Sequence, residues 1–83
     1  MSGGYFNYEQ KYINEIALAI DDLLVNNHSN EDTYSPEIIE QFKVGLSSLK
    51  VASIYAQRID WLVSGDDGEQ SFLGRLKDDL NEL

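Results

Sequence analysis

The sequence contains no cysteine, one proline, one histidine and one tryptophan among its 83 residues. Without cysteine the chain can form neither disulfides nor thiolate metal sites. A chain of this size buries only roughly 60–65% of its unfolded surface, so its core is marginal unless a metal, a disulfide or a second chain supports it. We therefore expect one small domain, residues 1–83, that gains stability by packing against a partner.

Basic residues are scarce: six Lys and Arg stand against fifteen Asp and Glu, which gives a net charge of −9. A polyanion repels phosphate groups, which argues against direct binding to nucleic acid or to anionic membranes and favours basic protein surfaces. The longest apolar run, Ile16 to Ile20, is far short of the ~20 residues that span a bilayer. The first residues do not form a basic and apolar leader, so we expect a cytoplasmic protein.

A helix-start signal at Ser35 and Pro36 and a helix-stop signal at Gly65, with no proline and one glycine between them, predict a long central helix over 36–64. Ser35 suits an N-cap and Pro36 the first helical position, where its missing N–H costs nothing. Gly65 suits the left-handed conformation that ends many helices. Gly45 lies inside this helix and marks either a bend or a close helix crossing.

Two shorter helices are predicted on either side of the long one. Asn7 has Gln three residues later, in capping-box spacing, which predicts a first helix over about 7–26. Asp67 has the same spacing to Gln, which predicts a last helix over about 67–82. The predicted fold is all-α, with three helices in a small helical bundle and the long helix antiparallel to both neighbours.

Apolar residues recur every three or four positions in all three segments, a helical and not a strand pattern. In the long helix they form two adjacent stripes. The first stripe is Ile38, Phe42, Leu46, Leu49, Ala52, Ala56, Ile59 and Val63, and the second is Val44, Val51, Tyr55 and Leu62. A helix that is apolar over more than one face has neighbours on more than one side. We therefore expect both short helices, or a second chain in a homodimer, to pack against it.

Catalytic groups do not form a recognisable set in this sequence. Residues 1–4 are expected to be a flexible tail and 27–34 a polar loop, which places the single histidine, His28, in solvent. The acidic turn from Gly65 to Gly68 lacks the spacing of a calcium loop and suits a helix end followed by a helix start. We expect no enzyme activity, no cofactor and no metal.

Three tyrosines near the N-terminus are candidates for partner binding. Tyr5, Tyr8 and Tyr12 are spaced three and four residues apart, so on one helix they form a single aromatic line. Tyrosine is enriched at protein interfaces, although these rings could equally cover the end of the core with their hydroxyls outward.

Three acidic residues near the C-terminus are a second group of candidates. Asp78, Asp79 and Glu82 crowd the end of a helix, where the helix dipole favours cations. Stability does not explain this placement. The carboxylates either solubilise the end of the chain or present charges spaced like phosphates to a basic, nucleic-acid-binding protein.

Three functions remain compatible with the sequence. The first is a small protein–protein interaction or regulatory module without catalytic activity. The second is an inhibitor, encoded by a phage or mobile element, that mimics nucleic acid through its acidic surface. The third is a self-assembling homodimeric bundle. Ionic strength separates the first two, because salt weakens charge-based capture steeply and an apolar interface hardly at all.

Overall fold

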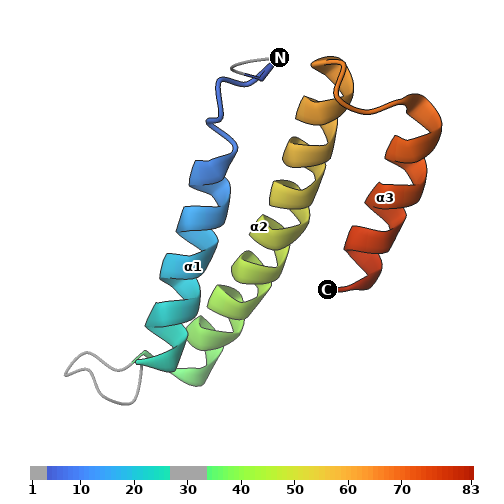
Figure 1. The fold of residues 1–83 in the computed structure, drawn as a ribbon. Helices are drawn as coiled ribbons and strands as arrows, with labels where there is room; N and C mark the ends of the chain where they lie inside the picture. The colour runs from blue at the N-terminus through green and yellow to red at the C-terminus, as the bar shows by residue number, and fades with distance from the viewer. Residues whose placement is uncertain (1–3, 27–33) are drawn as a thin grey trace.

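The computed structural model describes residues 4–26 and 34–83 and contains three helices (Figure 1). These are α1 (Lys11–Val25), α2 (Pro36–Val63) and α3 (Glu69–Asn81), joined in that order. No strand occurs in these two ranges, so the all-α class with a long central helix is confirmed. Most of the predicted tail and loop, with His28, lies outside the described residues.

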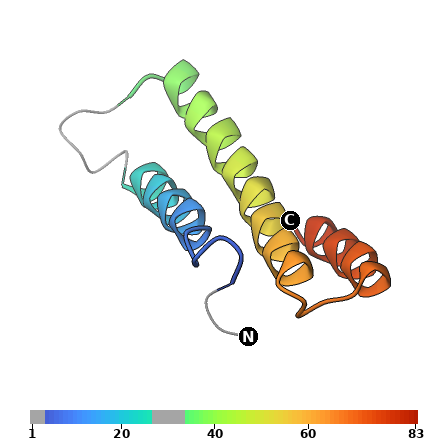
Figure 2. The ribbon, with the colours of Figure 1, turned by 90° about the horizontal axis from the view of Figure 1, so that it is seen from above.

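The three helices lie side by side in one layer, with α2 in the middle (Figures 1 and 2). Both α1 and α3 run antiparallel to α2, as predicted, and they pack on opposite sides of it without contacting each other in the described residues. The principal-axis extents of the molecule are 48 × 25 × 14 Å, so it is elongated and flattened. In the described residues the three helices lie in a row, and both the closed bundle and the homodimer stay predictions.

Both ends of α2 lie where the sequence places them. Ser35 is the N-cap and Pro36 the first helical residue, although the Ser35 side chain makes no capping hydrogen bond. At the other end Gly65 has φ +85°. Its N–H donates to the Leu62 carbonyl (3.2 Å), and the next N–H donates to that of Trp61 (2.9 Å). These two bonds are the Schellman motif, which uses carbonyls that the helix end leaves unpaired.

The predicted start of α1 at Asn7 is wrong by four residues. Residues 5–10 form turns, with positive φ at Asn7 (54°) and Tyr8 (63°), and the helix begins at Lys11. The cause is a long-range contact. The backbone N–H groups of Tyr5 and Phe6 are held by side chains at the end of α2, so the chain has to bend before it can enter α1.

The predicted cap of α3 is also wrong by one residue. Gly68, in an extended conformation, is the N-cap, and Asp67 precedes it. The Asp67 carboxylate accepts a hydrogen bond from the Gly68 N–H (3.0 Å) and another from Arg75 (3.1 Å). It therefore fixes the turn before α3 instead of capping the helix itself.

The core of the single layer is very small. Ala17 is the one apolar residue among those described that is fully buried, and the inward positions of α1 around it are half-buried. Those positions are Ile13, Ala17, Ile20 and Leu24, at the three-to-four spacing of one helix face. Many large apolar side chains remain exposed. The fold therefore leaves much of its apolar surface uncovered.

We expect Gly65→Ala to lower the free energy of unfolding by about 1–2 kcal/mol, because a left-handed conformation strains any residue with a Cβ. The matched substitution Gly74→Ala, in the middle of α3 with nothing within 4 Å of the added Cβ, should raise stability by about 1 kcal/mol. Urea unfolding followed by circular dichroism measures both. Equal effects of the two substitutions would contradict the assigned helix end.

Candidate functional site

One side of α2 is apolar and exposed along almost its whole length. Residues on a helix advance by about 100° each, so positions three, four and seven apart share a side. On this side lie Ile38, Ala52, Tyr55, Ile59 and Val63, with Val44 and Val51 at its α3 edge, all exposed. After the first turn no charged residue occupies this side. Glu40 and Arg58 are about five turns apart and share the α3 side, while Lys43 and Lys50 line a hollow elsewhere.

Neighbouring helices extend this apolar side. Ala56 of α2 lines a hollow with Glu9 and Ile13 at the α1 edge, and Val63, two turns further on, lines one with Leu73 at the α3 edge. The side of α1 that carries Glu9 continues along the helix as exposed apolar residues. We define the apolar face as Tyr12, Ile16, Ala19 and Leu23 of α1, the α2 residues Val44, Val51, Ala52, Tyr55, Ile59 and Val63, and Leu73 of α3.

The opposite side of the layer is polar. One hollow there is lined by Lys43, Lys50 and Glu82 among others, and a second by Arg58, Trp61 and Arg75 with acidic residues of the turn before α3. The guanidinium of Arg58 lies over the Trp61 ring, 4.9 Å from its centroid. We call this side the polar face. The charged residues of α2 beyond its first turn therefore lie at the polar face or the α3 edge, whereas Glu69 of α3 lines the hollow beside Val63 and Leu73 on the apolar face.

The three predicted tyrosines do not form one helical line. Tyr12 belongs to α1 and to the apolar face, with the Lys11 ammonium 5.3 Å from its ring centroid. Tyr8 lies in the turn before α1 with φ 63°, so the helical spacing does not apply to it. Tyr5 is exposed and packs edge-on against Phe6, with ring centroids 5.3 Å apart. The structure thus places one of the three on the apolar face.

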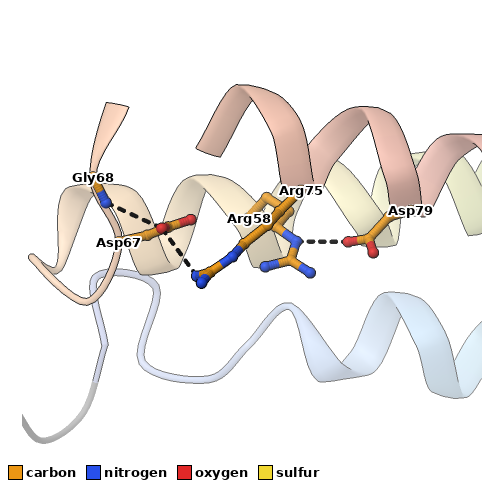
Figure 3. Close-up of polar contacts among 5 residues, drawn as sticks. All are labelled: Arg58, Asp67, Gly68, Arg75 and Asp79. Atoms are coloured by element: carbon orange, nitrogen blue, oxygen red, sulfur yellow. Dashed lines mark hydrogen bonds and ion pairs between the residues drawn. The ribbon is translucent and has the colours of Figure 1, made fainter. Parts of the chain in front are cut away.

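The three predicted acidic residues also separate. Asp78 and Glu82 are exposed on α3. Asp79 instead accepts a hydrogen bond from the Arg58 Nε at 2.6 Å, which ties α3 to α2 (Figure 3). This hydrogen bond and the charge of Arg58 lower the pKa of Asp79 below its ordinary 3.8, despite partial desolvation. Asp79 is therefore a structural residue in this chain.

A polar line on α2 anchors the start of the chain, and the sequence interpretation did not identify it. Asp60, 2% exposed, accepts the Phe6 N–H at 3.0 Å, and Ser64 Oγ accepts the Tyr5 N–H at 2.9 Å. A Cβ added to Gly4 would lie 2.8 Å from an Asp60 carboxylate oxygen, so that position needs glycine. One turn earlier, Gln57 accepts a hydrogen bond from the buried Gln10.

A signal for this polar line is present in the sequence. The side of α2 that faces α1 begins with apolar residues and continues with polar ones at the same spacing. In order these are Phe42, Leu46, Leu49, Ser53, Gln57, Asp60 and Ser64. Polar residues on an inward line require polar partners, because unpaired buried polar groups are costly. The segment before α1 supplies backbone N–H groups to Asp60 and Ser64, and the side-chain amide of Gln10 to Gln57.

Other kinds of site find less support. Over residues 4–26 and 34–83, no group of three His, Asp or Glu residues is placed to hold a metal ion. The helices described are too short or too polar to cross a membrane. Comparison with protein-family models, with curated proteins and with solved structures gives no match to this chain. The apolar face is therefore the candidate functional site, on its geometry and chemistry.

Asp60→Ala should release the segment before α1. The half-buried Phe6 N–H then loses its acceptor, and we expect a loss of about 1–3 kcal/mol of stability. Hydrogen exchange read at the Tyr5 and Phe6 amides should accelerate more than exchange within α3. Asp60→Asn keeps an oxygen acceptor and serves as the control, with a smaller effect. Unchanged exchange at Phe6 in the alanine variant would contradict the anchoring role.

Asp79→Asn should destabilise the fold in a pH-dependent way. Because the folded pKa of Asp79 lies below 3.8, its stabilising contribution is complete above pH 3.8 and is lost as the pH falls further. The urea midpoint of the variant should therefore lie below that of the wild type at pH 7, and the two should converge towards pH 2.5. Asp78→Asn removes the same charge from an exposed neighbour and should not lower the midpoint. A pH-independent difference would contradict the Arg58 pair.

Proposed function

We propose that this chain is a small, acidic, non-catalytic protein–protein interaction module of the cytoplasm that binds protein through its apolar face. The observation that carries this proposal is an uncharged apolar side of α2, continued by the exposed stripe on α1. Large contiguous apolar patches are rare on soluble monomers and mark interaction sites. The face contributes Val, Ile, Leu, Ala and Tyr, which suit burial against another apolar surface.

The shape of the layer supports the same proposal. A helix buries its apolar stripe against another element, and stable domains use at least two packed layers. This chain has one layer, and its own helices bury little more than Ala17. A partner on the apolar face supplies the missing layer. Binding therefore contributes directly to the stability of the module.

Nucleic-acid mimicry through the acidic surface has weaker support, so we rank it second. One of the three acidic candidates, Asp79, is neutralised by Arg58. Arg75 and two lysines lie on the same polar face as the exposed Glu82. A phosphate mimic needs an array of unpaired carboxylates, and the polar face mixes both signs of charge.

Covalent footprinting in a cell lysate tests the proposed surface. Tyr55 on the apolar face and Trp61 on the polar face are almost equally exposed in the single chain, at 41% and 39%. We expect hydroxyl-radical labelling of Tyr55, normalised to the urea-unfolded chain, to fall several-fold below that of Trp61, and the protection to persist in 1 M salt. Equal labelling would contradict the proposal. Protection of the polar face alone, removed by salt, would favour mimicry.

A further inference from the structure

We infer that the start of the chain, residues 4–10, is a two-state strap. In the first state the strap docks on the C-terminal end of α2, as in the structure (Figure 1). In the second state it leaves α2 and continues α1 towards the N-terminus by one helical turn, with Asn7 as the N-cap. The inference rests on three features of this segment and not on the apolar face, so it is independent of the proposed function.

Two backbone hydrogen bonds hold the strap in its docked state. The Phe6 N–H donates to the Asp60 carboxylate at 3.0 Å, and the Tyr5 N–H donates to Ser64 Oγ at 2.9 Å. Asp60 is almost fully buried, and a buried carboxylate is costly without hydrogen-bond donors. The backbone of Gly4 passes so close to Asp60 that an added Cβ would lie 2.8 Å from a carboxylate oxygen. Docking therefore satisfies the polar end of α2.

Docking strains the backbone where the strap joins α1. Asn7 has φ 54° and Tyr8 has φ 63°, and we call these two residues the hinge. The left-handed conformation is unfavourable for residues with a Cβ; asparagine tolerates it, but tyrosine gains nothing there. Strained residues persist only where other contacts hold them, and they are common in switch regions. In the second state Tyr8 is helical, with φ about −63°, and Asn7 takes the extended conformation of an N-cap, so both leave the positive-φ region.

The first turn of α1 lacks the cap that its sequence provides. Gln10 is the N-cap in the docked state, in a helical conformation and without a side-chain capping hydrogen bond. Gln10 is buried, and its Oε1 atom has no hydrogen-bond partner among the described residues. When Asn7 is the N-cap, Gln10 becomes the third helical residue and a capping box forms. The Asn7 side chain then accepts the Gln10 N–H, and Gln10 Oε1 accepts the Asn7 N–H. Extension of α1 therefore pairs the atom that docking leaves unpaired.

Each state satisfies groups that the other leaves without partners. Docking pairs Asp60 and Ser64 but strains the hinge, whereas extension relieves the hinge and completes the cap of α1. Release of the strap uncovers Asp60 and Ser64. A partner that donates hydrogen bonds to these two acceptors competes with the strap and selects the extended state. The strap is thus an autoinhibitory contact for the end of α2.

Nuclear magnetic resonance of Asp60→Ala tests for the second state. In the wild type, Tyr8 should show the strong NOE between its own amide proton and Hα that marks positive φ. In the variant we expect this NOE to weaken and a helical NOE to appear from the Tyr8 Hα to the Lys11 Hβ protons. Asp60→Asn keeps an oxygen acceptor and should stay closer to the wild type, and unchanged α3 signals show that the chain folds. A released strap without helical NOEs would overturn the inference.

Two variants of Tyr8 give an independent measurement in a chain that keeps Asp60. Tyr8→Gly and Tyr8→Ala remove the same side chain, so they differ only in backbone preference. Glycine adopts positive φ freely and is unfavourable in a helix, whereas alanine has the opposite preferences. We expect hydrogen exchange at the Phe6 amide to be slower in Tyr8→Gly than in Tyr8→Ala, on the order of 10-fold, with equal exchange within α3. Equal exchange at Phe6 would overturn the two-state strap.

Two variants of Asn7 in the Asp60→Ala chain, where the strap is released, test the capping box. Serine is about as good an N-cap as asparagine, and alanine is a poor one. Asn7→Ser should therefore keep the helical NOEs of Tyr8, and Asn7→Ala should weaken them. Helical NOEs of equal strength in the two variants would overturn the extension of α1 to Asn7.

Discussion

The helix packing in the described part of the chain depends on one constraint: α2 is in contact with both other helices, and those two helices do not touch each other. A 28-residue helix has more side-chain surface than two shorter helices can cover when they lie in one plane with it. The sides of α2 therefore differ in their chemistry. One edge packs on α1, the opposite edge packs on α3, and of the two remaining sides one is charged and the other apolar.

At the edge of α2 that faces α1, polar contacts and apolar contacts have different roles in packing the two helices. Apolar packing is non-directional, so stripes such as Leu46–Leu49 against α1 specify that the helices pair but only loosely fix their register. Asp60 and Ser64 each accept one backbone N–H from the segment before α1, and the Gln57 side-chain oxygen accepts a hydrogen bond from the side-chain amide of Gln10. These hydrogen bonds are satisfied in one alignment only, and a shift by one turn leaves buried polar groups unpaired. The polar contacts between α1 and α2 thus set the register of the two helices, and the apolar contacts stabilise their packing.

The sequence predicted correctly those parts of the fold that depend on interactions between residues close together in the chain. The ends of α2 follow from Pro36 and Gly65, whose backbone preferences act within a few residues. The exposed apolar side of α2 draws residues from both predicted stripes, so the sequence did not separate the covered side from the exposed one. The start of α1 could not be predicted in this way. Asn7 has the right spacing for a cap, but Asp60, more than 50 positions away, holds the neighbouring Phe6 amide and overrides that preference. Hydrogen bonds between residues far apart in the sequence leave no short-range pattern. The polar residues on the side of α2 that faces α1 were the only sequence signal for them.

The acidic candidate residues of α3 also show that the sequence alone does not predict long-range contacts, here between side chains. Asp78 and Asp79 are identical and adjacent, yet the helix turns by about 100° between them, so one points to solvent and the other reaches Arg58. Composition alone makes both part of one acidic patch. Once Asp79 is assigned to the α2–α3 contact, the exposed carboxylates of α3 become a rim around a face that also holds arginine and lysine. The apolar face has no such compensation, because none of the residues that the structure describes covers it, and it is therefore a better candidate for binding than the acidic surface.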